Sequence, residues 1–206
     1  QVLDLATAFH HCEVRGKRIG IVTNAGFEAV GMADAVIGAR YALDIPELSE
    51  NTKAKIQRVV AQAKLDRLVN VRNPLDVTPM AGEQVYAESA RAFLEDDKID
   101  AVIVSVVPFT SELTTTVEEL ESARRSLADE LPELLKQYNK PLIAVIDAGK
   151  MYDPLALLLR RRGIPVFPSC DQAIRSLGRY VCHRVEHSWE SSVRSAESAK
   201  ILEPVA

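Results

Sequence analysis

The chain has 206 residues, of which 47% are hydrophobic and 26% are charged, and its formal net charge is −4 at pH 7. This balance is typical of a globular domain with a sizeable core, and the scattered basic residues of an acidic chain argue against nucleic acid as a partner. No apolar run approaches the ~18 residues of a membrane span, and no signal peptide opens the sequence. The widely spaced Cys12, Cys170 and Cys182 predict free thiols and a cytoplasmic location, without a disulfide framework or a zinc cluster.

The two ends of the chain indicate a piece of a longer protein. The first residue is Gln1 rather than Met, and a helical pattern begins at once. We expect residues 1–17 to be a helix or linker from a preceding domain and residues 18–187 to form one α/β domain. Residues 188–206 are expected to be a linker toward a further domain or a helix that rests on the sheet.

Apolar runs alternate with amphipathic segments along the chain. The runs predict strands over residues 18–23, 41–45, 100–107, 141–146 and 164–167. The amphipathic segments predict helices over residues 2–13, 27–39, 50–64, 84–94, 154–162 and 171–183. A further charged helix is expected to open with a capping box of Thr116 and Glu119 and to be interrupted at Pro132 before Gln137.

This alternation predicts an α/β fold. Five strands with intervening helices favour a flavodoxin-like three-layer sandwich, whose parallel sheet has the strand order 2-1-3-4-5. That order places a topological switch point between the first and third strands. We therefore expect a ligand at the carboxyl ends of these strands, between the turn at residues 24–26 and the segment 107–110.

The turn that follows the first strand is the strongest candidate for a binding site. Asn24, Ala25 and Gly26 interrupt the apolar run, and a helix-like pattern resumes directly after them. Unpaired N–H groups and the helix dipole at such a helix start can hold a phosphate or a carboxylate. The alternative is a turn that only reverses the chain.

A second candidate segment surrounds two prolines. Pro74 and Pro79 exclude a helix over residues 71–79 and predict a rigid, irregular loop, with Asn73, Pro74, Asp76 and Thr78 as supporting residues. Asp76 either accepts N–H groups near the helix start or caps its own loop locally, and we favour the local cap.

Residues 18–26, together with segments at 46–53, 73–78 and 163–167, resemble motifs of the NDP-forming acyl-CoA synthetases, the acetate–CoA ligase relatives of succinyl-CoA synthetase. Residues 18–26, R-I-G-I-V-T-N-A-G, are similar to the family's R-I-A-I-V-T-N-A-G-G-P-G signature. Residues 46–53 are similar to its E-L-S-E-E-T-K, residues 73–78 to its N-P-x-D-[VL]-T loop, and residues 163–167 to its G-I-P-V-F strand. The matches keep the family's order over about four-fifths of the chain.

The resemblance implies a reversible reaction of acyl-CoA, phosphate and ADP that gives a carboxylic acid, CoA and ATP. In this family phosphate cleaves the thioester, and the phosphoryl group passes to a histidine and then to ADP. The histidine, CoA and the nucleotide belong to separate phosphohistidine, CoA-binding and ATP-grasp domains, which are the implied partners. ADP or ATP, Mg²⁺, CoA and phosphate are therefore expected in the full-length protein, and none of them is expected to be bound by this domain alone.

By the same resemblance, this domain has no catalytic side chain and no metal ligand, and its helix start stabilises the phosphoryl group. None of its four histidines matches the family's catalytic position. The isolated chain is accordingly expected to be inactive as a ligase. His183 to His187 also fit the H-x-x-E-H pattern of some zinc peptidases, but only a short tail follows to supply a third ligand, so we interpret this match as chance.

The sequence departs from the family pattern at the helix start. Phe27 and Glu28 follow Gly26, where relatives carry a second glycine and then Pro–Gly. A carboxylate in the first helical turn suits the dipole but repels a phosphate unless its side chain turns away. The alternative function is therefore a non-catalytic binding, regulatory or assembly module of the same fold. The acyl group, the choice of ADP or GDP and the oligomeric state, a homo-oligomer included, stay open.

Overall fold

The computed structural model describes the backbone of residues 2–10, 12, 14–37, 43–122 and 125–201, and the side chains of residues 5–10, 12, 14–36, 43–122 and 125–185. Its sheet has five parallel strands in the order β2-β1-β3-β4-β5, which confirms the predicted α/β class and strand order. The strands are β1 (Ile19–Thr23), β2 (Leu75–Asp76), β3 (Ala101–Val106), β4 (Leu142–Ile146) and β5 (Val166–Phe167).

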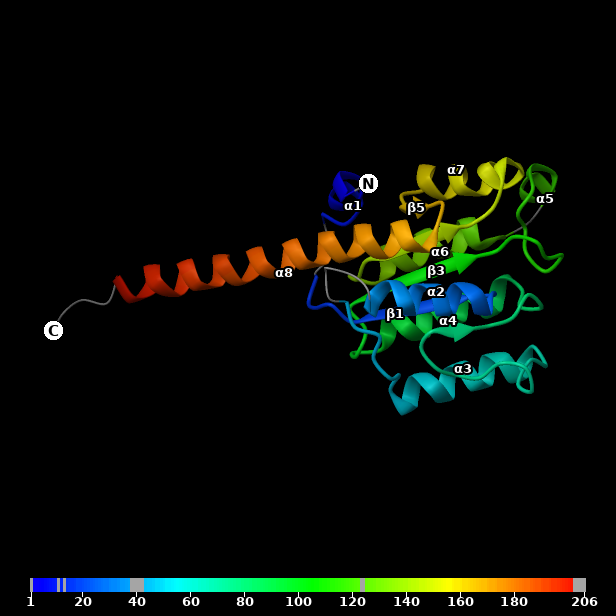
Figure 1. Cartoon of the computed structure of the whole chain (residues 1–206), viewed down its shortest axis with the longest axis horizontal. Helices are drawn as coiled ribbons and strands as arrows, with labels where there is room; N and C mark the ends of the chain where they lie inside the picture. Colours follow the sequence, from blue (N-terminus) through cyan, green and yellow to red (C-terminus); the bar gives the residue numbers. More distant parts are fainter. Residues whose placement is uncertain (1, 11, 13, 38–42, 123–124, 202–206) are drawn as a thin grey trace.

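Helices cover both faces of the sheet (Figure 1). On one face α2 (Gly26–Ile37) packs beside the first part of α8 (Cys170–Ile201), and α1 (Val2–Ala8) packs against α8. On the other face α4 (Glu83–Glu95) and α6 (Leu127–Gln137) pack together, with α3 (Glu50–Gln62) beside α4 and α7 (Asp153–Arg161) beside α6. The short helix α5 (Val117–Ser122) and the 3₁₀ turn η1 (Lys150–Tyr152) lie in connecting segments.

The three central strands β1, β3 and β4 are buried at every residue, as expected for parallel strands covered on both faces. An ion pair ties β1 to β3 at their amino ends. The Nη2 and Nε atoms of Arg18 donate to the Asp100 carboxylate at 2.7 and 2.8 Å. Burial acts to raise the pKa of Asp100, but its bonds with Arg18 outweigh burial and hold this pKa below its ordinary value.

The predicted strand over residues 41–45 is wrong for residues 43–45, the part that the structure describes. Residues 41 and 42 lie outside the described residues, and Asp44 forms only an isolated bridge with Arg18. The second strand is instead β2, which lies inside the segment predicted to be irregular and pairs Leu75 with Val22. Two residues are too few to show a strand pattern in the sequence, and it is the parallel pairing with β1 that makes this segment a strand.

Several helix boundaries also differ from the prediction, and the first helix, α1, ends at Ala8 rather than at residue 13. The capping box is present, since Glu119 accepts from the Thr116 N–H at 2.9 Å, but that helix ends at Ser122. A new helix, α6, starts after Ser126 with its own capping box and continues through Pro132 without interruption. The last helix, α8, continues to Ile201 and so includes most of the predicted tail, with its end projecting beyond the sheet (Figure 1).

Gly20 allows a close approach of β1 to α4, and its replacement tests this packing. A Cβ atom at Gly20 would lie 2.1 Å from Cδ1 of the buried Phe93. We expect Gly20→Ala to lower the free energy of unfolding by about 3 kcal/mol, because a close-packed core resists added volume. Urea denaturation measures the change.

Gly31 in α2 provides the matched control, since nothing lies within 4 Å of the position that a Cβ atom would occupy there. Gly31→Ala should raise the free energy of unfolding by about 0.5–1 kcal/mol through helix propensity. Equal stabilities of the two variants would contradict the packing described for β1.

Candidate functional site

Asn24 joins the ends of β1 and β3 at the predicted switch point. Its side-chain amide donates to the Val107 carbonyl at 2.9 Å, and the Val107 N–H donates to Asn24 Oδ1 at 2.9 Å. Asn24 is buried, so both bonds are shielded from water. The turn and the segment after β3 therefore lie together at the carboxyl edge of the sheet, as the strand order predicts.

The start of α2 presents backbone N–H groups to solvent. The Ala25 N–H donates to Thr23 Oγ1 at 3.2 Å, and the Glu28 N–H donates to the Ala25 carbonyl at 3.0 Å. For the N–H groups of Gly26 and Phe27, the described part of the chain offers no hydrogen-bond acceptor, and both residues are exposed. These two donors at the positive end of the helix dipole can bind an anion.

Glu28 lies in the first turn of α2, but its side chain turns into the protein and is only 2% exposed. Its Oε2 atom accepts from Thr23 Oγ1 at 2.6 Å and from Ser105 Oγ at 2.7 Å. Its Oε1 atom accepts from Cys170 Sγ at 3.5 Å. One carboxylate therefore ties the first turn of α2 to β1, to β3 and to the start of α8.

Burial sets the protonation of this network. Burial raises the pKa of Glu28 above its ordinary value, and hydrogen bonds from Thr23, Ser105 and Cys170 oppose the rise. Burial and the charge of Glu28 raise the pKa of Cys170 to about 12. The Cys170 thiol therefore keeps its proton at neutral pH and acts as a donor to Glu28 rather than as a nucleophile.

Asp147, directly after β4, completes a group of three possible metal ligands with Glu28 and Cys170, whose ligand atoms lie within 4.8 Å of one another. A metal would require Cys170 to lose its proton and Glu28 to give up three donors. The hydrogen bonds account for Glu28 and Cys170 as they stand, so we assign no metal to this group.

The loop around β2 supports the turn from its other side. Asn73, next to the half-buried Pro74, accepts from the Ile21 N–H at 3.1 Å and donates to the Ile19 carbonyl at 2.8 Å, so its amide extends the pairing with β1. Asp76 Oδ1 accepts from the Thr78 N–H at 2.9 Å. This is the local cap that the sequence favoured, and it holds Thr78 at a φ of 69°, which β-branched residues rarely adopt.

Asp76 also approaches the helix start. Its Oδ2 atom lies 3.2 Å from the position that a Cβ atom at Gly26 would occupy. The described residues show the local cap and no hydrogen bond from the N–H groups of Gly26 or Phe27 to Asp76, so Asp76 borders the helix start without accepting from it. The structure brings the turn and the loop together, and their role in binding stays a prediction.

Ser105 and Cys170 are the site residues that the sequence did not indicate. Ser105 could have been found, since it is the one polar residue in the buried strand Ala101–Val106. Nothing in the pattern around Cys170 indicates its contact with Glu28. His183 is exposed on α8, while the side chains of residues 186 and 187 lie outside the described residues, so the H-x-x-E-H match is not tested.

Two further findings concern the cysteines and the helices. Cys12, Cys170 and Cys182 are free thiols, as predicted. Of the helices that the structure describes, none combines the length and apolar character that a membrane crossing requires.

Known proteins with similar sequences are CoA ligases. No family model matches the sequence. The alpha subunit of ADP-forming acetate–CoA ligase II from Pyrococcus furiosus is 29% identical to it over 170 residues, which cover 81% of this chain. The chain is related to the ADP-forming acetate–CoA ligases. A trans-feruloyl-CoA synthase, FCS1, from an unknown prokaryotic organism is 25% identical over 181 residues.

Solved structures agree on the fold. A crystal structure of the Pyrococcus horikoshii protein PH0766 superposes with a TM-score of 0.72 at 26% identity, covering 89% of this chain and 39% of that one. The dinucleotide-forming acetyl-coenzyme A synthetase 1 of Ca. Korarchaeum cryptofilum, in complex with phosphate and ADP, superposes with a TM-score of 0.71 at 18% identity over 91% of this chain and 38% of that one. The chain spans 34% and 22% of the lengths of the two sequence relatives, so it corresponds to one part of such proteins.

The raised pKa of Glu28 predicts a pH dependence of stability. The folded protein holds this proton more tightly than the unfolded chain does, so the free energy of unfolding should fall as pH rises from about 4.5, the ordinary pKa, through the raised value. Glu28→Gln cannot ionise and can still accept from Thr23 and Ser105. We expect its stability, relative to the unsubstituted chain, to increase over this range in urea denaturation between pH 4 and 8.

The control is Glu121→Gln, at an exposed position on α5. It should leave the pH dependence unchanged. A constant difference between Glu28→Gln and the unsubstituted chain at every pH would show that burial does not shift the ionisation of Glu28.

Proposed function

We propose that this chain is a domain of an ADP-forming acyl-CoA synthetase, which converts acyl-CoA, phosphate and ADP into a carboxylic acid, CoA and ATP and can run in reverse. The observation that carries the proposal is the fixed helix start, where the N–H groups of Gly26 and Phe27 face solvent in a chain related to acetate–CoA ligases. The domain boundaries at residues 17 and 187 and a cytoplasmic location belong to the same proposal.

The role of this chain in that reaction is electrostatic. The two N–H groups and the dipole of α2 stabilise a phosphoryl group while it is carried by a histidine of another domain. Because Asn24 and Thr23 fix the turn, the donors do not need to reorganise when the anion arrives. Glu28 does not block this role, since its carboxylate faces Thr23, Ser105 and Cys170.

Four exposed apolar side chains follow the carboxyl ends of the strands and are called the apolar rim. They are Phe27, Met80, Phe109 and Met151, which each follow a different strand, from β1 to β4. Phe109 packs edge-on against Tyr152 with ring centroids 5.4 Å apart. Because the carboxyl ends of parallel strands lie at the same edge of the sheet, the rim and the predicted anion site lie at that same edge. We propose that the domain carrying the histidine covers this rim, while CoA and the nucleotide with Mg²⁺ bind on further domains.

The competing proposal is a binding or regulatory module without phosphoryl transfer. It is favoured by the charges near the helix start, where Glu28, Asp76 and Asp147 lie. Each of these carboxylates would weaken binding of a dianion in the absence of a cation from elsewhere. The domain content of the full-length protein distinguishes the two proposals, since only the enzyme requires phosphohistidine and ATP-grasp domains.

Phosphoryl transfer can be tested in the full-length protein. Incubation with acetyl-CoA or a panel of acyl-CoAs and labelled phosphate should give an acid-labile label on a histidine. Gly26→Val should reduce the labelling rate at least about tenfold, because the side chain would crowd Asp76 and cover the N–H donors.

Gly31→Val is the matched control, since Gly31 lies on the exposed side of the same helix with open space around it. It should label at the unsubstituted rate. Absence of label with every acyl-CoA, in a folded protein, would favour the module instead.

The apolar rim predicts how this chain associates with the rest of its parent protein. When both parts are expressed separately, the chain alone should show no ligase activity, and mixing should restore it. Met80→Ser with Phe109→Ser should weaken the association at least about tenfold, because two apolar side chains would no longer be buried.

Leu68→Ser is the control, because Leu68 is an exposed apolar residue outside the rim. It should leave the association unchanged. Turnover by the isolated chain would contradict the proposal that it needs the other domains. Equal weakening of the association by both sets of substitutions would contradict the role of the apolar rim.

A further inference from the structure

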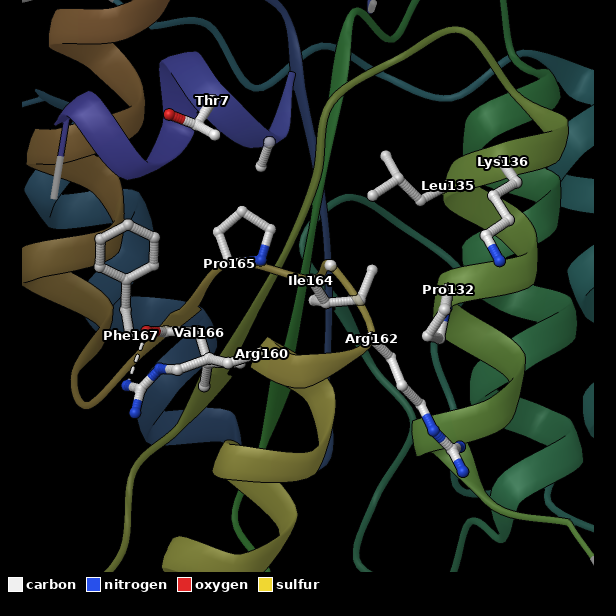
Figure 2. A pocket seen from close by; sticks show the side chains of 12 residues that line it. Thr7, Pro132, Leu135, Lys136, Arg160, Arg162, Ile164, Pro165, Val166 and Phe167 are labelled. Carbon is white, nitrogen blue, oxygen red and sulfur yellow. Dashed lines mark hydrogen bonds between the residues drawn. The ribbon is translucent and has the colours of Figure 1, made fainter. Parts of the chain in front are cut away.

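A cavity of about 630 Å³ lies at the outer edge of the sheet, away from the helix start of α2. It is formed by the last turns of α1, α6 and α7 and by the segment that leads into β5 (Figure 2). These elements meet at the amino end of β5, whereas the turn at Asn24 follows the carboxyl end of β1. The cavity is therefore separate from the predicted anion site, and its volume is in the range of small-molecule sites.

The floor of the cavity is apolar. Leu135, Ile164 and Pro165 lie side by side in its centre, and Pro132 and Phe167 continue the apolar surface (Figure 2). The Thr7 hydroxyl is the only uncharged polar side-chain group in the lining that the structure describes. Such a surface suits a hydrocarbon or aromatic body and offers little to a sugar or another molecule rich in hydroxyl groups.

The charged groups of the lining all have one sign. Lys136, Arg160 and Arg162 line the cavity, and the residues described there include no carboxylate, although the whole chain has a net charge of −4. The amino group of Lys136 and the guanidinium group of Arg160 lie on opposite sides of the apolar floor (Figure 2). This charge distribution favours an anion and disfavours a cationic ligand.

The three cations differ in how they are held. Arg160 Nη2 donates to the Val166 carbonyl at 3.0 Å, and Arg162 forms an ion pair with Asp129. Lys136 forms no hydrogen bond or ion pair with the residues that the structure describes. Lys136 is exposed, and its ammonium group is thus the one available to pair with a ligand, whereas Asp129 offsets the charge of Arg162.

We propose that this cavity binds a small molecule with an apolar body and a single anionic head group, a carboxylate or a phosphate, which pairs with Lys136. The site is additional to the proposed phosphoryl-transfer function and does not depend on it. The apolar body covers Leu135, Ile164 and Pro165, so affinity requires both parts of the ligand.

Isothermal titration calorimetry of the 206-residue chain with octanoate, octyl phosphate and octan-1-ol tests the proposal. We expect at least one of the two anions to bind, at least about tenfold more tightly than the alcohol of the same chain length. The tighter of the two identifies the head group. Absence of binding by both anions, or equal binding of the alcohol, would overturn the proposal.

Substitutions place the binding in this cavity. Lys136→Glu should weaken binding of the anion about tenfold, while Lys136→Arg should keep it within about threefold. Arg67→Glu makes the same charge change at an exposed turn elsewhere, and should leave binding unchanged. If Arg67→Glu weakens binding as much as Lys136→Glu does, the anion responds only to net charge and the site is refuted.

Discussion

A carboxylate that is removed from water needs protein donors in place of its hydration shell, and Glu28 obtains three of them. The donors come from the end of β1, from β3 and from the first residue of α8, elements that are remote in sequence. Once Glu28 is satisfied in this way, the first turn of α2 has a fixed position relative to the sheet. The orientation of the exposed N–H groups at Gly26 and Phe27 follows from that constraint, and so does the outward direction of Phe27.

The architecture could be predicted because each central strand can be recognised from its own apolar sequence. β1, β3 and β4 are apolar at nearly every position, and this is the mark of strands buried on both faces. β2 could not be predicted in the same way, because it consists of Leu75 and Asp76 beside a proline. Its pairing depends on Val22 and on the amide of Asn73, which bonds to β1. The strand order was correct although the wrong segment was assigned to its second position.

In the candidate site, too, the features that depend on local sequence could be predicted, and those that depend on distant contacts could not. Asn24, Gly26 and Asp76 could be selected from the sequence, since a turn after a buried strand and a loop with two prolines are local features. Whether Glu28 would face the helix start or turn away could not be decided, because the answer depends on Ser105 and Cys170 at sequence separations of 77 and 142 residues. Such contacts exist only after the sheet and α8 have come together.

The charges at the carboxyl edge explain why this site would need a partner. Backbone N–H groups supply only partial positive charge, and Asp76 and Asp147 stand nearby with Glu28 buried beneath. A phosphate dianion therefore gains less electrostatic binding free energy here than at a helix start flanked by arginine or lysine. A phosphoryl group delivered on a histidine of another domain does not have to be captured from solution, so weak but well-oriented donors are sufficient. Under the proposed function, the exposed Phe27 and Phe109 would lie against such a domain, and this chain would supply one half of the site.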